Sequence, residues 1–330
     1  MSWRNAARFA EYVRDVSGVQ TLVQSWTGDV VALLLILITG TGYYLCHRRA
    51  RSAGGVGRHQ AWCFGAGLVW WLLATHSVIA VYTPVLFWVR ALQVLLLLYV
   101  VPFLLAMGQP VTVLREASGP NVRARLDAML GSRVARVVLS PPVTSVLMLA
   151  TPWLLYLTPW YVASMVNPVI ADLTRIALSA IGFCYFYTRL QADPVPRRYS
   201  PLLSIGISVA EGLGDGILGL VLWLGPLIAY DYYSALHRDW GPSLRDDQTL
   251  GAGVLWILGD VLGVPFIMVL MRALGSHERR HAAEVDAEID AELGAPDDVG
   301  AHADDEAGHA TLWWEKDPQL QDRFHPPKRR

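Results

Sequence analysis

The side chains in this chain that could do chemistry are ionisable groups inside long apolar runs. An ionisable side chain at the centre of a bilayer costs from about 3 to more than 10 kcal/mol, so each one is expected to have a partner. Asp172 and Arg175 are three residues apart and would share one face of a helix. The same holds for Glu211 and Asp215, which are four residues apart. The candidate polar core consists of His76, Arg90, Gln93, Asp172, Arg175, Glu211, Asp215 and Asp260.

This candidate core has two interpretations. As a functional site it would open outward and hold a cation, a proton or a loop of a partner protein. As a structural element it would be an internal ion-pair network that fixes the register of the helices. Glu211, Asp215 and Asp260 are predicted near the middle of the bilayer, and the other members in its outer third.

Residues that bind metals or act as nucleophiles are few in the apolar runs. His76 is the only histidine there, and Met148 and Met165 are the only methionines in or beside the outer half. Soft copper(I) sites normally gather two or three sulfur or nitrogen donors, so His76 is a weak candidate metal ligand. The sequence has no nucleophile triad, phosphate-binding loop or dinucleotide-binding glycine motif. We therefore expect no enzymatic activity.

Seven runs are long and apolar enough to position these residues across a bilayer. A spanning helix needs about 20 mostly apolar residues, because the hydrocarbon core is about 30 Å thick. The pairs Gly212/Gly216 and Gly259/Gly263 predict close helix packing. The fold class is therefore all-α, a polytopic membrane protein with seven transmembrane helices. The predicted spans are 29–46, 61–82, 86–107, 138–157, 168–190, 202–230 and 250–274.

Composition agrees with this class and excludes others. The chain is 53% hydrophobic and 17% charged, with a mean hydropathy of +0.34, which argues against a soluble enzyme. The net charge of −1 averages an acidic tail with arginine-rich loops and indicates no nucleic-acid partner. The chain has 25 arginines and two lysines, a usage typical of a GC-rich, actinobacterium-like genome.

The arginines also predict orientation and domain boundaries. Fourteen lie on one set of loop faces and five on the other, which places the N-terminus outside and the C-terminus in the cytoplasm. The predicted parts are an extracytoplasmic segment (1–27), a transmembrane domain (28–274) and an acidic, partly disordered cytoplasmic tail (275–330). The connection 108–137 mixes apolar residues with arginines and predicts a short amphipathic helix that anchors to the inner membrane surface.

Three stretches carry motifs that point to a known family. They are RALQV at 90–94 with YVVPFLLAMGQP at 99–110, then ADLTR at 171–175 with GFCYFY at 182–187 and DPVPR at 193–197, and finally DQTLGAGVLWILGD at 247–260 with ERR at 278–280. In this order they resemble the multi-spanning CtaG family of cytochrome c oxidase assembly factors. The motif residues are Pro102, Gly108, Pro110, Asp247, Gln248, Gly251 and Trp256.

The resemblance implies an assembly factor that helps a terminal haem-copper oxidase to form, through maturation of its copper centre among other routes, or to associate in the plasma membrane. Its implied partners are subunits of that oxidase and the lipid bilayer. It also implies histidines at three positions where this chain has Arg90, Ala171 and Arg175. Arginine has no lone pair for a metal, so these positions argue against copper as a bound cofactor. With Arg90 and Arg175 facing Asp215 and Asp260, the core would be a salt-bridged scaffold instead.

Two other functions are compatible with the residues. A transporter could move copper or a haem-related solute through the polar core, around helices broken near Pro102, 141–142 and Pro152. A structural accessory subunit of a respiratory complex would need no moving solute at all. The seven predicted spans contain no internal repeat, which argues mildly against transport.

Overall fold

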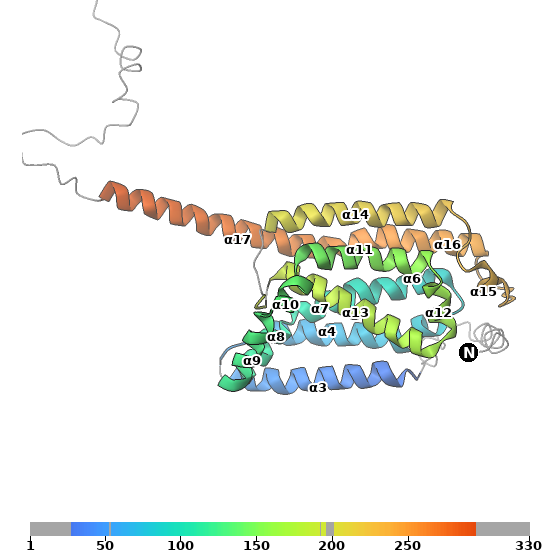
Figure 1. Cartoon of the computed structure of the whole chain (residues 1–330), viewed down its shortest axis with the longest axis horizontal. Coiled ribbons are helices and arrows are strands. Elements are labelled where there is room, and N and C mark those ends of the chain that lie inside the picture. The colour runs from blue at the N-terminus through green and yellow to red at the C-terminus, as the bar shows by residue number, and fades with distance from the viewer. Residues whose placement is uncertain (1–27, 53, 192, 196–200, 295–330) are drawn as a thin grey trace, which may run out of the picture. The chain divides into compact units, whose positions relative to one another are not determined.

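The structure, a computed structural model, describes residues 28–52, 54–191, 193–195 and 201–294. Every regular element in this described part is helical, which confirms the all-α prediction (Figure 1). The chain divides into two compact units, Met1–Glu278 and Arg279–Arg330. The predicted N-terminal segment 1–27 and most of the predicted tail lie outside the described residues.

The helices follow one another with short connections. The first half of the chain forms α3 (Val30–Ser52), α4 (Arg58–His76), α5 (Val78–Tyr82), α6 (Phe87–Leu95), the π-helix η1 (Leu96–Val100), α7 (Val101–Met107), α8 (Pro110–Ala117), α9 (Pro120–Leu130) and α10 (Arg133–Val138). The second half forms α11 (Pro141–Leu157), α12 (Trp160–Val166), α13 (Pro168–Leu190), α14 (Pro201–Leu224), α15 (Tyr230–Ser234), α16 (Leu244–Gly253), the π-helix η2 (Val254–Leu258) and α17 (Gly259–Gly294).

Six helical stretches in the described residues are long and apolar enough to cross a membrane, and a seventh span results if α11 and α12 count as one. These two helices are bent by 73° at their junction. Pro159 disfavours helical backbone at the residue before it, and Thr158 is accordingly extended. The protein is therefore a multi-pass membrane protein, and the predicted seventh span depends on a broken helix. The N-out orientation stays a prediction.

Several predicted boundaries were wrong for local reasons. The helix predicted to reach residue 230 ends at Leu224, before Gly225 and Pro226. The last span begins at Leu244, six residues early, because the Ser243 hydroxyl caps it by accepting the Asp246 N–H at 3.2 Å. The single amphipathic helix predicted within 108–137 is three helices, α8, α9 and α10.

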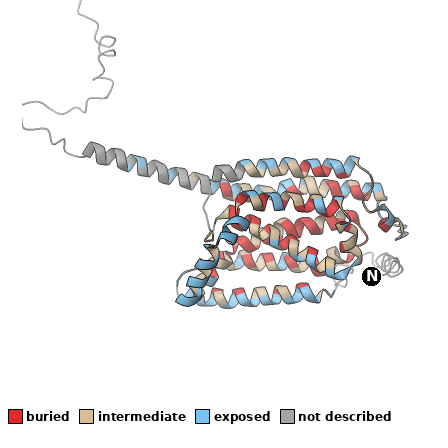
Figure 2. Ribbon diagram, viewed as in Figure 1, coloured by how far each residue is buried: buried red, intermediate tan, exposed pale blue. Residues whose placement is uncertain are grey.

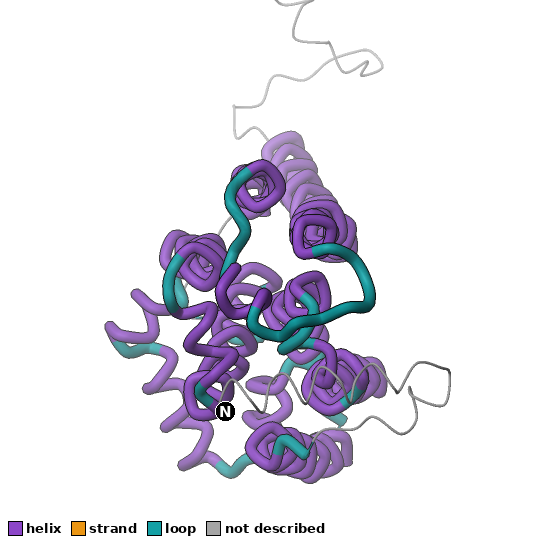
Figure 3. Tube along the Cα trace, turned by 90° about the vertical axis from the view of Figure 1, so that its right-hand side faces the viewer, coloured by secondary structure: helices purple, strands orange, loops and turns teal. Residues whose placement is uncertain are grey.

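The continuous stretch α6–η1–α7 lies at the centre of the bundle. In the most apolar part of the helical stretch Phe87–Ala117, 67% of the residues are buried, against 39% or less in the corresponding part of each other candidate span. Figure 2 shows buried residues concentrated on the central helices, and Figure 3 shows the surrounding helices from one end of the bundle. The outer helices α3 and α14 keep many large apolar residues exposed, as expected of helices that face lipid.

Proline and glycine explain the course of the central stretch. Pro102 cannot donate to the carbonyl of Leu98, and the π-helical turn η1 lies directly before it. A Cβ on Gly182 of α13 would lie 2.1 Å from that carbonyl oxygen, so the backbones meet where Pro102 frees it. A Cβ on Gly108 would lie 2.7 Å from Phe64. The motif residues Pro102 and Gly108 thus serve helix packing.

Candidate functional site

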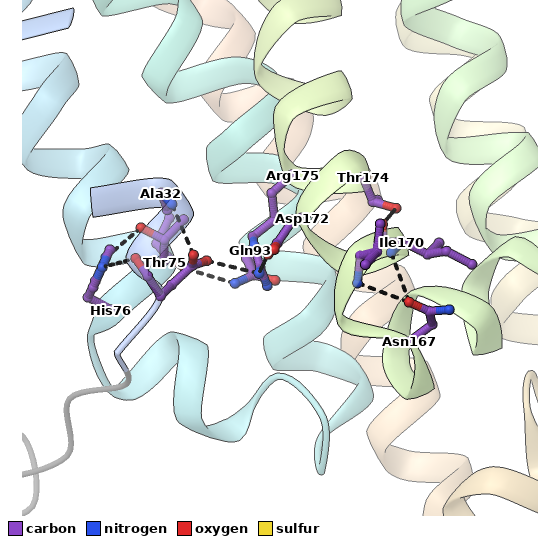
Figure 4. A network of polar contacts seen from close by, with 12 residues as sticks. Ala32, Thr75, His76, Gln93, Asn167, Ile170, Asp172, Thr174 and Arg175 are labelled. Carbon is purple, nitrogen blue, oxygen red and sulfur yellow. Dashed lines mark hydrogen bonds and ion pairs between the residues drawn. The ribbon is translucent and has the colours of Figure 1, made fainter. Parts of the chain in front are cut away.

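The first polar cluster joins α3, α4 and α13 near one end of the bundle, and we name it the Arg175 cluster: Asp29, His76, Asp172 and Arg175 (Figure 4). The Arg175 guanidinium lies 2.9 Å from the Asp29 carboxylate and also contacts Asp172, one turn earlier on α13. The other oxygen of the Asp29 carboxylate accepts the Ala32 N–H at 2.9 Å, at the start of α3. One guanidinium therefore bridges two carboxylates and ties α3 to α13.

His76 in this cluster is buried, and both nitrogens of its ring have partners. Its Nδ1 lies 2.8 Å from the Thr75 hydroxyl, and its Nε2 lies 3.0 Å from the backbone oxygen of Asp29. A metal ion would have to displace one of these partners. Across the described residues, no three His, Cys, Asp or Glu side chains are grouped closely enough to hold a metal ion.

Arg90 is fully buried beside this cluster, and its partners are neutral. Its guanidinium donates to the Gln93 amide oxygen at 2.8 Å and to the Ser164 hydroxyl at 3.0 Å. Gln93 in turn donates to the backbone oxygen of Ala74 at 2.8 Å. Arg90 and Gln93 thereby connect α6 to α12 and α4. In the part of the chain that the structure describes, no carboxylate forms an ion pair with Arg90.

The expectation that Arg90 and Arg175 face Asp215 and Asp260 is wrong in this structure. Asp215 is held by Tyr99, which follows Arg90 by nine residues along the central stretch. At 1.5 Å per residue this separation is about 14 Å, far beyond the reach of an ion pair. The predicted single core is therefore two clusters at different depths.

The second cluster, which we name the Arg189 cluster, consists of Tyr99, Tyr185, Arg189, Glu211 and Asp215. The side chain of Arg189 is completely buried and donates to the Glu211 carboxylate at 2.9 Å. The Tyr185 hydroxyl donates to the other oxygen of Glu211. The Tyr99 hydroxyl donates to Asp215 at 2.6 Å. Helices α13 and α14 and the π-helix η1 thus meet through charged and phenolic groups.

A cavity of about 80 Å³ lies against this cluster. Glu211, Asp215 and Asp260 line it together with Ser208 and Met148. Three carboxyl groups meet one guanidinium here, and an excess of carboxyl groups favours a positively charged species or bound protons. This volume suits a small cation or a few water molecules and is well below that of sites for larger ligands. This cavity is the best candidate in the described residues for a site that binds a solute.

Both π-helical turns adjoin this region. Tyr99 belongs to η1, and Trp256 of η2 packs on the glycine face of α14. A Cβ would approach the Trp256 side chain within 3.1 Å at Gly216 and within 2.8 Å at Gly219. The predicted close packing is therefore confirmed at Gly216, whereas a Cβ at Gly263 would meet nothing within 4 Å. Such turns interrupt helices and are frequent at functional sites.

The motif residue Asp247 is buried and binds the backbone at the start of α6. Its carboxylate accepts the backbone N–H groups of Phe87 at 3.1 Å and Trp88 at 3.0 Å, and pairs with Arg238 at 3.2 Å. A carboxylate at a helix N-terminus satisfies unpaired donors and complements the helix dipole. A Cβ on Gly251 would lie 2.4 Å from the Phe87 ring, so this contact requires glycine.

Its neighbour Gln248 secures the connection after α14. The side-chain oxygen accepts the Ile228 N–H at 2.7 Å. The amide nitrogen donates to the backbone oxygens of Leu222 at 2.6 Å and Pro226 at 2.9 Å. The Asp-Gln pair of the third motif thus organises backbone, and neither side chain faces the cavity of the Arg189 cluster.

Asp193 does the same for the start of α8, whose first residue is the motif residue Pro110. Its carboxylate accepts the N–H groups of Val111 at 3.2 Å and Thr112 at 2.8 Å. Burial raises the pKa of the Asp193 carboxyl above its ordinary value, and the hydrogen bonds from Thr112 and Val111 oppose that shift.

Sequence reasoning missed the residues that hold the clusters together. From the sequence, Asp29 was interpreted only as the first residue of a predicted span, and Arg189 only as one of the loop arginines that predict orientation. Tyr99 and Tyr185 were interpreted only as parts of apolar spans and family motifs. The available signal was the four-residue spacing of Tyr185 and Arg189, which places a phenol and a guanidinium on one helix face.

Comparison with known proteins adds the following. Residues 41–275 match the family described as cytochrome c oxidase caa3 assembly factor (Caa3_CtaG). An uncharacterized protein of Mycobacterium leprae is 26% identical over 288 residues, and uncharacterized proteins of Mycobacterium bovis and Mycobacterium tuberculosis are each 25% identical. Each match covers 84% of this chain and 43% of the relative, so the chain spans less than half the length of these relatives. No solved structure matches the chain.

Proposed function

Because the chain belongs to the cytochrome c oxidase caa3 assembly factor family, we propose that it assists the biogenesis of a terminal haem-copper oxidase in the plasma membrane. The family match over residues 41–275 is the observation that carries this proposal. The protein would act by binding oxidase subunits within the bilayer, without enzymatic turnover. The mycobacterial relatives support an actinobacterial setting for this role.

The polar interior supports a scaffold rather than a carrier of copper. Where the family resemblance implies histidines, Arg90 and Arg175 present guanidinium groups that cannot coordinate a metal. Arg90 is engaged by neutral partners and Arg175 by two carboxylates. His76 has both ring nitrogens occupied. This set of donors does not fit copper, so the role in the oxidase's copper centre would be indirect.

The experiment that tests the proposal is the reduced-minus-oxidised haem a spectrum of membranes from a deletion strain, with and without added copper. We expect the haem a band to fall, to stay low with copper, and to return when the intact chain is supplied. An unchanged spectrum would refute a role in oxidase biogenesis. Rescue by copper alone would refute the scaffold and support delivery of copper to the oxidase as the function.

The copper content of the purified protein tests the scaffold directly. We expect less than one copper per chain after incubation with copper(I) and removal of loosely bound metal, because the described residues offer no three-donor group. One tightly bound copper per chain would contradict this expectation. Iron measured on the same sample serves as a control for adventitious metal.

The cavity of the Arg189 cluster favours one second candidate, transport of copper or another small cation. A haem-related solute, the other cargo considered from the sequence, is too large for about 80 Å³ and carries carboxylates that the acidic lining would repel. Among the described residues, three carboxyl groups and no guanidinium line it, and two π-helical turns interrupt the helices beside it. Uptake into proteoliposomes distinguishes the two functions. A scaffold gives no uptake above empty liposomes, whereas a transporter gives uptake that Asp260→Asn reduces. A structural accessory subunit would instead copurify with the mature oxidase in fixed proportion.

A further inference from the structure

The helices α9 and α10 bury none of their residues, although both carry large apolar side chains. Met129 is 68% exposed and Val134 is 72% exposed, and Val122 and Val137 are exposed as well. α8 packs on α3 through the buried Val113, so the segment is fixed to the bundle at one end while α9 and α10 stay uncovered. These two helices need an apolar partner outside the chain.

Arginines border this apolar surface. On α9 the apolar residues Val122, Leu126 and Met129 recur at helical spacing and form one stripe. Arg125 lies at one edge of the stripe, and α10 adds Arg133 and Arg136; all three are exposed. An apolar stripe with arginines at its border is the pattern of a helix that lies in a membrane interface, where long side chains reach the headgroups.

The charges of the segment divide into two groups. Arg115 pairs with Asp127 at 3.0 Å, and Arg123 pairs with Glu116 at 3.3 Å. In contrast, Arg125, Arg133 and Arg136 form no ion pair within the described residues. The uncompensated charge thus lies on the two helices whose apolar residues are uncovered.

The position in the fold agrees with a membrane surface. Figure 1 shows α8, α9 and α10 crossing one end of the bundle, where α3 ends and α4 begins. The same end carries four further exposed arginines without an ion pair in the described part of the chain. They are Arg48, Arg49, Arg51 and Arg58. At the opposite end the described residues contribute Arg175, Arg238 and Arg245. Arg175 and Arg238 form ion pairs with carboxylates, and Arg245 donates to carbonyl oxygens.

We propose that the surface formed by Val122, Arg125, Met129, Arg133, Val134, Arg136 and Val137 binds anionic phospholipid of the surrounding bilayer. The apolar side chains enter the boundary between headgroups and acyl chains, and the arginines bind the phosphate groups as charge-assisted hydrogen-bond donors. The protein would thereby prefer membranes rich in phosphatidylglycerol or cardiolipin. This inference does not depend on the proposed role in oxidase assembly.

The test is the thermal stability of the purified full chain in neutral detergent, titrated with phosphatidylglycerol or with phosphatidylcholine. We expect phosphatidylglycerol to raise the Tm more than phosphatidylcholine does, and high salt to reduce the difference. Inorganic phosphate at the same concentration should give no shift, because it has no acyl chain to insert. Equal shifts from both lipids would overturn the proposal, because the surface would then not distinguish an anionic headgroup.

Variants assign the effect to this surface. The triple substitution Arg125→Gln, Arg133→Gln and Arg136→Gln should lower the apparent affinity for phosphatidylglycerol about a hundredfold, at about fivefold per arginine. The matched triple substitution to Lys keeps the charge and should retain most of the affinity. A full phosphatidylglycerol effect in the Gln triple would overturn the assignment.

A variant of opposite sign keeps the proposal falsifiable if the triple variant is poorly produced. Glu116→Gln with Asp127→Asn releases Arg123 and Arg115 from their ion pairs and adds positive charge to the segment. We expect tighter binding of phosphatidylglycerol and an unchanged response to phosphatidylcholine. Unchanged or weaker binding of phosphatidylglycerol by this variant would contradict the proposal.

Discussion

The Arg175 cluster and the Arg189 cluster lie on the same helix but differ in how their charges are used. The two arginines are fourteen residues apart on α13, which is about 21 Å along the axis. Arg175 bridges Asp29 and Asp172, and these groups fill the junction of α3 and α13. Arg189 pairs with Glu211 alone among the acidic side chains described.

The other carboxyl groups beside the Arg189 cluster have no cation as a partner among the described residues. Asp215 accepts the Tyr99 hydroxyl, and Asp260, at the wall of the cavity, is hydrogen-bonded to Trp256. The same residue types join helices at one depth and line a cavity at the other. The comparison shows that packing around an intramembrane charge, rather than the charge itself, separates a structural site from a candidate binding site.

The largest effect should come from removing Arg189. Arg189→Met removes a completely buried cation and leaves the partly buried Glu211 carboxylate without it, and we expect a loss of about 3 kcal/mol in the free energy of unfolding. Adding Glu211→Gln should recover most of that loss, because the uncompensated charge is then gone. Abundance in membranes and Tm in detergent measure both. A double variant as unstable as the single one would show that Glu211 does not depend on Arg189.

Arg175→Met should have a smaller effect, about 1–3 kcal/mol, because the Arg175 side chain is 21% exposed and water can reach its carboxylate partners. The Tm and the membrane abundance of the variant, compared with those of Arg189→Met, check this ranking. A loss equal to that of Arg189→Met would remove the distinction between the two clusters. Asp172→Asn, which leaves Asp29 to pair with Arg175, is the matched milder change.

Asp215→Asn should change stability by less than about 1 kcal/mol, because an amide oxygen can still accept the Tyr99 hydroxyl. If the cavity is a functional site, the variant should be present at normal abundance and fail to restore oxidase activity to a deletion strain. Normal abundance with full restoration would show that function does not require the Asp215 carboxylate, whereas reduced abundance would assign Asp215 to structure. Tyr99→Phe, which removes the same hydrogen bond from the other side, controls for the loss of the bond.

The smallest effect concerns Asp193, which lies outside both clusters and serves as a reference for a purely structural carboxyl. Its pKa is raised in the folded protein, so the folded state binds a proton more tightly than the unfolded state. Its contribution to stability therefore grows as pH falls and is lost as pH rises through the folded pKa. The Tm of the unmodified chain relative to Asp193→Asn should rise as the pH is lowered from neutral toward the ordinary pKa of an aspartate, about 4. A difference independent of pH would contradict a raised pKa for Asp193.

Much of the architecture could be predicted from the sequence because lipid imposes a simple rule. Every buried backbone group must be paired within its own helix, so a long apolar run has few alternatives. The predicted run 168–190 coincides with α13, and 86–107 coincides with α6–η1–α7 apart from one residue. The break at Pro159 and the early cap at Ser243 were missed, because hydropathy does not register local turns.

The candidate site could be predicted only in part. The residue types were identified correctly, and the sharing of one helix face by Asp172 and Arg175 is confirmed by their contact. The partners of Arg90 and Arg175 were not identified correctly. Helical periodicity fixes the face on which a residue lies, but it does not fix the neighbouring helix or the relative depth of two side chains.

The amino-acid pattern alone thus indicated a helical protein that crosses the membrane several times, carries charges within its spans and belongs with oxidase assembly factors. The packing of the helices was needed to show that those charges form two clusters and that Asp247 and Gln248 bind backbone groups. The two kinds of information differ in the sequence distance that they span. Hydrophobic patterning is a local property of the chain, whereas the pairing of Arg189 with Glu211 depends on how α13 packs against α14.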